Sequence, residues 1–239
     1  LKHEANNLIH GTLRHFSKHE KTIGTPPDWF LNPFNGARHT GSKLHWTLLP
    51  DFSLNFGDIK NLWETSRFNW LVTLARATVA TGDSLYIEVG NEWLSDWLKR
   101  NPLNQGPNWK CGQETSIRVF NMINSCLILN ESKSSMTALP DIVNDHLERI
   151  SKSILYGIAQ NNNHGTSEAA ALYIGGSWLY ELEPSKYSAA KGYAQKGLFW
   201  LENRVKKLVG SDGGFSQYST TYHRVFLDTM IFLEYWGVK

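Results

Sequence analysis

The chain has few cysteines and little excess charge. Its two cysteines, Cys111 and Cys126, fall in one predicted helix, whose rise over that distance separates them by roughly 22 Å, so no disulfide is expected. The formal net charge is +2 and the isoelectric point is about 8.5. That balance is too mild to indicate nucleic acid or an anionic membrane as a partner.

Long apolar runs and metal-binding clusters are also missing. No stretch of about 18 apolar residues occurs, so no transmembrane span is predicted. Cysteines and histidines do not recur at metal-ligand spacing, and neither a metal nor another cofactor is expected. The chain begins LKHEANN without an initiator methionine or a signal peptide, as expected if an upstream segment had been removed, and the compartment stays open.

Aromatic residues, by contrast, are abundant. Hydrophobic residues make up 41% and charged residues 19% of the chain, a composition typical of a globular fold. There are ten tryptophans, and aromatic residues reach 13%. Such a density fits either a core packed with large side chains or a sugar-binding cleft lined with stacking platforms, and composition does not separate the two.

Apolar residues recur at helical spacing from Asp58 onward. The period and the stop signals predict seven helices, over about 58–81, 86–100, 113–130, 140–159, 166–181, 184–209 and 221–239. No segment alternates like a strand, and residues 1–56, rich in Pro, Gly and Asn, are predicted to form an irregular arm on a helical domain over 57–239. Short loops favour antiparallel hairpins, hence an all-α (α/α) toroid, and the uncapped end YWGVK indicates that this toroid is incomplete and truncated.

Polar side chains gather before the fifth predicted helix, in QNNNHGTSE. With Thr166 as the N-cap, Glu168 falls in the first turn, and Asn162, Asn163 and His164 fall in the preceding loop. Backbone N–H groups at a helix start face an anion, so a substrate carboxylate would fit beside these Asn and His side chains. The alternative is a turn and a helix cap with no further role.

A second polar segment, DGGFSQYSTTYHR, precedes the last predicted helix. Gly213 and Gly214 predict a sharp turn, and Tyr222, His223 and Arg224 open the helix. A tyrosine beside a cation can serve as an acid or base, because a nearby positive charge lowers the tyrosine pKa. The alternative is a tyrosine with satisfied hydrogen bonds and a solvated His-Arg pair.

A third segment, NPLNQGPNWKCGQETSIR, precedes the third predicted helix. It presents Trp109 and then Gln113, Glu114 and Arg118, with the last two spaced to pair on one helix face. These residues form either a surface ion pair or a sugar-stacking platform with polar groups behind it. Because odd-numbered helices of an antiparallel array start at the same end, we expect the three segments to converge on one rim and form a single site.

These same segments resemble the heparinase II/III family of polysaccharide lyases, from about residue 32 to the end. The resemblance rests on Asp58-Ile59-Lys60 with Trp63-Glu64 and Arg67, NPLNQGPNWKCGQE with Arg118, NNNH with Glu168, and QYSTTYHR, in that order. It implies an incomplete (α/α) toroid followed by an antiparallel β-sandwich domain. The chain would hold only the toroid, so the β-sandwich domain would be absent from it and the isolated chain weakly active or inactive.

The resemblance further implies β-elimination on an acidic polysaccharide or oligosaccharide that contains uronic acid. Asn163 would neutralise the uronate carboxylate, His164 would assist it or abstract a proton, and Tyr222 would serve as acid or as both base and acid. The family's other catalytic group, a His or Tyr of the sandwich domain, has no counterpart here. A periplasmic or secreted location would follow. The implied substrate-binding residues are Trp109, Gln113, Glu114, Arg118, Asn162, Glu168, His223 and Arg224.

Two other functions stay open. An inverting glycoside hydrolase on a similar helical toroid would need two facing carboxylic acids, and the sequence offers no obvious pair among Asp58, Glu64, Glu114 and Glu168. A non-catalytic carbohydrate-binding module would keep an aromatic platform such as Trp109 and dispense with the acid and base groups. Whether the polysaccharide is sulfated is not set by the sequence.

Overall fold

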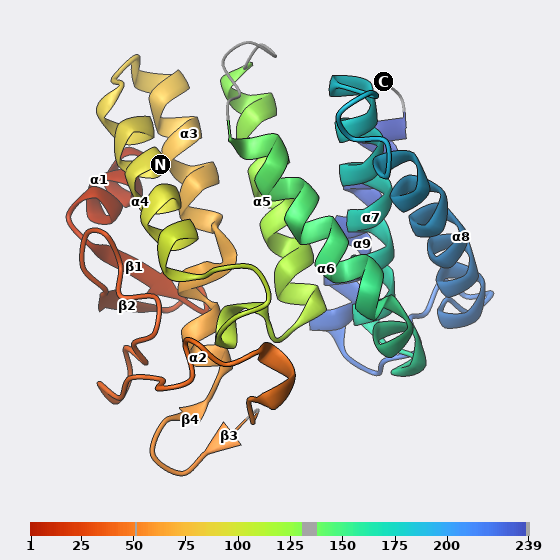
Figure 1. Cartoon of the computed structure of the whole chain (residues 1–239), viewed down its shortest axis with the longest axis horizontal. Coiled ribbons are helices and arrows are strands. Elements are labelled where there is room, and N and C mark those ends of the chain that lie inside the picture. The colour runs from red at the N-terminus through yellow and green to blue at the C-terminus, as the bar shows by residue number, and fades with distance from the viewer. Residues whose placement is uncertain (51, 131–137, 238–239) are drawn as a thin grey trace. The chain divides into compact units, whose positions relative to one another are not determined.

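The computed structural model describes residues 1–50, 52–130 and 138–237 (Figure 1). Most of these residues are helical, which confirms the predicted all-α class. The chain divides into two compact units. Unit 1 consists of residues 1–114 and 121–132, and unit 2 consists of residues 115–120 and 133–239.

Unit 1 begins with a helix and a β-hairpin that the sequence patterns did not predict. The hairpin strands pair antiparallel, with Thr12 opposite Thr22 and His15 opposite His19. The elements of this unit are α1 (Lys2–Ile9), β1 (Thr12–His15), β2 (His19–Thr22), η1 (Trp46–Leu48), β3 (Phe52–Ser53), β4 (Gly57–Asp58), α2 (Lys60–Trp63), η2 (Thr65–Arg67), α3 (Asn69–Thr81), α4 (Leu85–Arg100), η3 (Pro107–Trp109) and part of α5 (Gly112–Leu129). The expectations of a wholly irregular arm and of no strand are therefore wrong, because a four-residue strand is too short to show an alternating pattern.

Tryptophans form the core of unit 1. Trp70 lies against both Trp29 and Trp93, with ring centroids 6.1 and 5.3 Å apart, and all three are almost completely buried. Trp97 and Phe68 continue this cluster, with their ring centroids 5.0 Å apart. Eight of the ten tryptophans of the chain are buried: Trp29, Trp63, Trp70, Trp93, Trp97, Trp109, Trp178 and Trp236. The high tryptophan content therefore serves mainly core packing.

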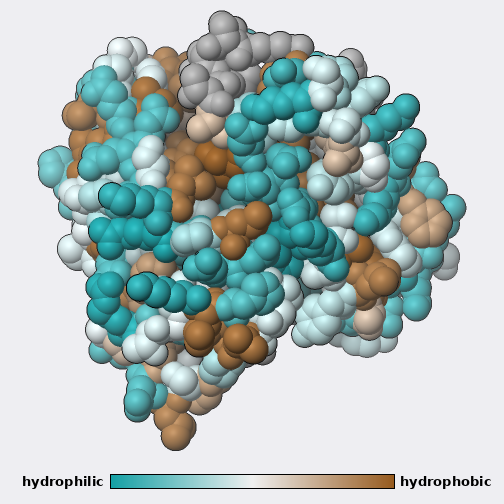
Figure 2. Space-filling model, in the orientation of Figure 1, coloured by the Kyte–Doolittle hydropathy of each residue, from teal (hydrophilic) through white to brown (hydrophobic). Residues whose placement is uncertain are grey.

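Apolar side chains also reach the surface of unit 1 at one hairpin. Figure 2 shows hydrophobic surface at the tip of the β3–β4 hairpin. Leu54, between the two strands, is 94% exposed, and Phe52 is 61% exposed. This tip is separate from the tryptophan cluster and contains no residue that the sequence analysis selected.

Unit 2 consists of long helices paired as antiparallel hairpins. Its helices are α6 (Leu139–Ala159), α7 (Asn163–Leu182), α8 (Ala190–Leu208) and α9 (Thr220–Gly237). Helix α7 contacts α6, α8 and α9, and is accordingly the most buried of them (Figure 1). Two glycines allow α7 and α8 to approach closely, since a Cβ on Gly176 would lie 2.6 Å from the Ala194 nitrogen and one on Gly197 would lie 2.4 Å from the Tyr173 nitrogen.

The predicted helix starts of unit 2 need two corrections. Helix α7 begins at Asn163, with Asn162 as its N-cap, so Thr166 lies inside the helix and is not the cap. The Thr166 hydroxyl instead donates to the Asn163 carbonyl at 2.8 Å. Helix α8 begins at Ala190, because the residues after Pro184 form turns before the helix starts.

Candidate functional site

The start of α7 is built by Asn162. Its side-chain oxygen accepts a hydrogen bond from the His164 backbone N–H at 2.9 Å, and its side-chain amide donates to Gln160 at 3.0 Å. Asn161 before it has a φ of 48°, in the left-handed region that asparagine tolerates. The three asparagines thus reverse the chain sharply and cap the helix, which is the structural role the sequence left open.

Asn163 is the first residue of α7 and is 2% exposed. Its backbone N–H donates to the side-chain oxygen of Gln217 at 2.9 Å. Gln217 lies between α8 and α9, in the QYSTTYHR segment. The bond therefore brings the Asn-His pair and the tyrosine segment together within unit 2, as was expected for these two segments. His164 beside Asn163 is half-buried.

Arg204, near the end of α8, holds the loop that leads into α7. Its guanidinium donates to the Ile158 carbonyl at 3.1 Å and to the Asn161 side-chain oxygen at 3.0 Å. Gly165 leaves room for this side chain, because a Cβ there would lie 3.0 Å from the Arg204 Cδ. Arg204 is buried, so it supplies both a structural tie and a positive charge close behind the start of α7.

Glu168 lies one turn beyond His164 and is only 2% exposed. Burial raises the pKa of its carboxyl to about 8, and the charge of Arg149 only partly opposes this. The carboxyl packs directly on the backbone of α6, since a Cβ on Gly157 would lie 2.8 Å from its Oε1. The expectation that Glu168 sits at the helix start is corrected, because α7 begins three residues earlier than predicted.

Arg118 is fully buried in unit 2 and makes a structural pair with a buried histidine. Its Nε donates to His146 Nε2 at 3.0 Å, and its NH2 donates to the Thr115 hydroxyl at 3.1 Å. The other His146 nitrogen, Nδ1, lies 2.8 Å from the Ile142 carbonyl and donates to it. Burial, followed by the charge of Arg118, holds the His146 pKa well below its usual value. Arg118 is 0% exposed, so these bonds are internal ties of unit 2, and the expected binding role of Arg118 stays a prediction.

The tyrosine segment is the exposed part of this region. Tyr222 is 43% exposed in the first turn of α9, while Tyr218, which directly follows Gln217, is fully exposed. His223 is half-buried and stacks on the buried Phe215, with ring centroids 6.3 Å apart. Arg224 is exposed. Two tyrosines, rather than Tyr222 alone, are therefore exposed in the segment that Gln217 joins to the start of α7.

Sequence reasoning missed three residues of this region: Gln217, Tyr218 and Arg204. Gln217 and Tyr218 lay within the QYSTTYHR segment, but the helix-start pattern drew attention to the residues after them. Arg204 lay inside a predicted helix, where a basic residue near the helix end is explained by the helix dipole alone. Only the fold shows that it reaches the Asn161 loop.

The remaining predicted residues belong to unit 1, and Trp109 is not a platform there. It is 2% exposed, its indole nitrogen donates to the Asn101 carbonyl at 3.0 Å, and its ring packs on Trp97. Gln113 is half-buried at the start of α5. The predicted sugar-stacking role of Trp109 is corrected, because both its ring and its polar group face the core.

Glu114 belongs to a buried ion cluster centred on Arg67. The Arg67 guanidinium donates to both Glu114 oxygens, from Nε at 2.7 Å and from NH2 at 2.8 Å. Its third nitrogen, NH1, binds Glu64, and the other Glu64 oxygen accepts from the Phe16 backbone N–H at 3.0 Å. Glu64 is 9% and Glu114 5% exposed, so this cluster is a structural tie within unit 1 and not the exposed ion pair considered above.

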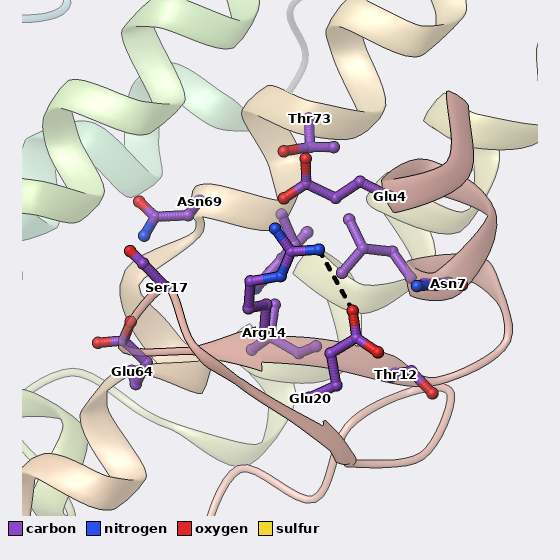
Figure 3. Close-up of a pocket in the computed structure, with 12 residues that line it drawn as sticks. Glu4, Asn7, Thr12, Arg14, Ser17, Glu20, Glu64, Asn69 and Thr73 are labelled. Atoms are coloured by element: carbon purple, nitrogen blue, oxygen red, sulfur yellow. Dashed lines mark hydrogen bonds and ion pairs between the residues drawn. The ribbon is translucent and has the colours of Figure 1, made fainter. Parts of the chain in front are cut away.

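A polar pocket of about 200 Å³ opens in unit 1 between α1, the β1–β2 hairpin and α3 (Figure 3). The guanidinium of Arg14 points into it between Glu4 and Glu20, and binds Glu20 at 3.2 Å. Its lining consists of Glu4, Asn7, Leu8, Thr12, Leu13, Arg14, Ser17, Glu20, Glu64, Asn69, Trp70 and Thr73. None of the substrate-binding residues expected from the sequence lines this pocket.

Within residues 1–50, 52–130 and 138–237, no three His, Cys, Asp or Glu side chains are grouped so that they could hold a metal ion. In the same residues no helix is long and apolar enough to cross a bilayer. Neither Cys111 nor Cys126 is part of a disulfide.

The fold places the chain among all-α proteins built from antiparallel helical hairpins. Residues 13–236 match the family described as heparinase II/III N-terminus. The chain belongs to this family, which confirms the resemblance drawn from its motifs.

Similar proteins agree with this assignment. A heparin-sulfate lyase of Pedobacter heparinus is 26% identical over 206 residues, which cover 82% of this chain and 29% of that protein. A crystal structure of heparan sulfate lyase from the same organism has a TM-score of 0.62 at 19% identity, and the match covers 98% of this chain and 35% of that one. A heparinase III structure has a TM-score of 0.64 at 18% identity and is covered to 34%. The structural likeness shows the fold, and the chain spans about a third of the length of these proteins.

Proposed function

We propose that the protein carrying this chain is a polysaccharide lyase that cleaves a uronic-acid-containing polysaccharide by β-elimination. The observation that carries this proposal is the bond between Asn163 and Gln217, which joins a helix start suited to a carboxylate with a segment that carries two tyrosines. The family membership and the lyase names of the relatives support the same reaction class.

The reaction needs three groups. In the uronate, the C5–H bond and the C4–O bond to the neighbouring sugar break, and a C4–C5 double bond forms. A donor must stabilise the negative charge that spreads onto the carboxylate, a base must take the C5 proton, and an acid must protonate the leaving oxygen. Asn163 with the positive end of α7 fits the first role, His164 assists, and a tyrosine fits the second or third.

Asn163 is preferred over Asn162 as the carboxylate-binding residue because it directly precedes His164. The Asn162 side chain caps α7 by accepting from the His164 backbone N–H. Asn163 is buried, so the half-buried His164 beside it would make the first contact with a substrate. We expect Asn163→Ala to lower the rate of unsaturated product formation about 10²- to 10³-fold. The measurement is ultraviolet absorbance of the product, with the full-length protein on a panel of uronate polysaccharides and Asn144→Ala as the control.

The panel should begin with heparan sulfate, because the relatives are named for it. The net charge of +2 does not favour a heavily sulfated substrate over an unsulfated one, so unsulfated uronate polymers belong in the same panel. If no polymer gives an unsaturated product, the lyase proposal is wrong. If only the products of hydrolysis form, the chemistry is that of a glycoside hydrolase.

The acid or base is Tyr222 or Tyr218, and two conservative variants separate them. Tyr222 was expected from the sequence, whereas Tyr218 is the fully exposed neighbour of Gln217. We expect phenylalanine at the catalytic position to lower kcat about 10²- to 10⁴-fold, since only the phenol is lost. Tyr180→Phe on α7 is the matched control. Equal activity of Tyr218→Phe, Tyr222→Phe and the control would remove both tyrosines from the mechanism.

Glycan binding without catalysis is the second candidate, and the pocket of unit 1 favours it. Three carboxylates and one guanidinium line it, so a neutral or basic sugar unit fits better than a uronate. Titration of this chain with neutral and acidic oligosaccharides would test it, with Arg14→Ala expected to weaken binding. The hydrolase alternative has less support, because Glu64 and Glu114 are buried on Arg67 and do not face each other across an open cleft.

A further inference from the structure

The connection between α8 and α9 is fixed on both sides of Gln217. Before it, the Ser216 backbone N–H donates to the Leu208 carbonyl at 2.8 Å, and the adjacent Phe215 is buried. After it, the Ser219 carbonyl accepts from the His223 backbone N–H at 2.9 Å and begins α9. Only Gln217 and Tyr218 lie between these two anchors.

Gln217 ties this short stretch to α7. Its side-chain oxygen accepts from the Asn163 N–H at 2.9 Å, and its own carbonyl accepts from the Ser219 N–H at 2.7 Å. The Asn163 N–H is one of the first backbone donors of a helix, which have no partner inside the helix. A water molecule could satisfy that donor equally well, but it could not hold a neighbouring segment in place. The Gln217 side chain satisfies the donor and, because Gln217 is covalently linked to Tyr218, also holds the tyrosine segment in place.

Asn163 is therefore held from two directions. Arg204 fixes the loop before it through Asn161 and the Ile158 carbonyl. Gln217 fixes its own backbone to the tyrosine segment. The first tie connects α8 with the α6–α7 loop, whereas the second connects two segments that the proposed reaction needs in one geometry.

We propose that Gln217 is a positioning residue, which locks the tyrosine segment onto the first peptide of α7 and so sets the distance between Asn163 and the acid or base. This inference rests on the proposed lyase function. Its consequence is specific: loss of the bond lowers turnover with bound substrate, while affinity for the substrate changes little. If Gln217 only capped α7, its loss would lower the stability of the protein and leave the turnover of the folded protein unchanged.

The test compares two substitutions in the full-length protein. Gln217→Met keeps the length of the side chain and removes the acceptor, whereas Gln217→Glu keeps an acceptor at the same place. We expect Gln217→Met to lower kcat roughly tenfold to a hundredfold, with KM changed by less than about threefold. Gln217→Glu should retain most of kcat, with KM raised because its negative charge opposes a uronate. Gln195→Met, at an exposed glutamine of α8, is the matched control and should behave like the wild type.

Every outcome decides the matter. Wild-type kcat in Gln217→Met, or an equal loss of kcat in both variants at position 217, would overturn the positioning role. If Gln217→Met does not fold, Gln217→Ala takes its place, with thermal unfolding as the check. Failure of the lyase function looks different, because the wild type then gives no unsaturated product. Faster hydrogen exchange at the Asn163 amide of Gln217→Met would in that case identify Gln217 as a cap only.

Discussion

At the scale of single residues, Glu168 has a carboxyl group whose pKa burial shifts strongly. Its carboxyl is buried against the α6 backbone at Gly157, and burial raises its pKa to about 8 from 4.5, with Arg149 opposing. The folded state therefore holds a proton that the unfolded chain releases. Stability from this group is fully present below about pH 4.5 and is lost as the pH rises towards 8.

This gives a prediction for Glu168→Gln. The wild type should lose stability with rising pH between 4.5 and 8, by at most about 1.4 kcal/mol per pH unit from this group. The glutamine variant, which cannot ionise, should show a flatter profile and should exceed the wild type in stability above pH 8. Urea unfolding at a series of pH values measures this, with the exposed Glu202→Gln as control. Parallel profiles for the wild type and Glu168→Gln would show that Glu168 ionises freely in the folded protein.

At the scale of elements, the contact between α7 and α8 depends on Gly197. A Cβ there would lie 2.4 Å from the Tyr173 nitrogen and 2.6 Å from the Ala169 carbonyl oxygen, and both atoms belong to the α7 backbone. We expect Gly197→Ala to destabilise the protein by about 1–3 kcal/mol, because the two helices must move apart. Gly192 on the same helix has no atom within 4 Å of such a Cβ. Gly192→Ala should stabilise by about 0.5–1 kcal/mol through helix propensity.

The two glycines form a matched pair for chemical denaturation. Identical shifts for both alanine variants would mean that the helices are not in close contact at Gly197.

The N-cap of α7 provides an independent check on helix α7. Asn162→Ala should cost about 1 kcal/mol, and Asn162→Asp should cost little, since the carboxylate also accepts from the His164 N–H. If Asn162→Asp lost as much stability as Asn162→Ala, the side chain at position 162 would not act as a cap.

The sequence predicted the elements better than it predicted their contacts. The helices of unit 2 follow from apolar spacing. The apolar run after Thr166 predicts a cap at Thr166, whereas the side chain that caps the helix at its actual start is that of Asn162. Trp109 was assigned to a cleft because a loop precedes it, yet Asn101 and Trp97 enclose it in the core. Side-chain partners distant in the chain, such as Gln217 and Asn163, leave no periodic signal.

At the scale of the whole molecule, the two units use buried charge differently. Unit 2 buries Arg118, Arg149 and Arg204, with Glu168 as a buried carboxyl group near Arg149. Unit 1 pairs one guanidinium, that of Arg67, with the two carboxylates of Glu64 and Glu114. A surplus of buried positive charge around α7 suits the proposed acidic substrate, whereas the internally bonded cluster of unit 1 suits a structural role. The stability of unit 1 should therefore depend strongly on Arg67.

Removing Arg67 would leave two buried carboxylates without their cation. Arg67→Met should cost about 3–5 kcal/mol, because an unpaired buried charge is expensive even when the side chain is replaced by one of similar length. Arg67→Lys keeps the charge but cannot donate to both Glu114 oxygens in the same planar geometry, so an intermediate loss is expected. Arg76→Met, at an exposed arginine of α3, is the control and should change stability by less than about 0.5 kcal/mol.

Removal of the two negative charges separates this cluster from an ordinary packing defect. In Arg67→Met, the further changes Glu64→Gln and Glu114→Gln should recover part of the lost stability, because they remove the unpaired charges that the folded state must hold. Urea unfolding of Arg67→Met and of the triple variant measures this recovery. A loss of equal size in both would mean that Arg67 stabilises unit 1 through packing of its side chain, and that the two carboxylates reach solvent once the guanidinium is gone.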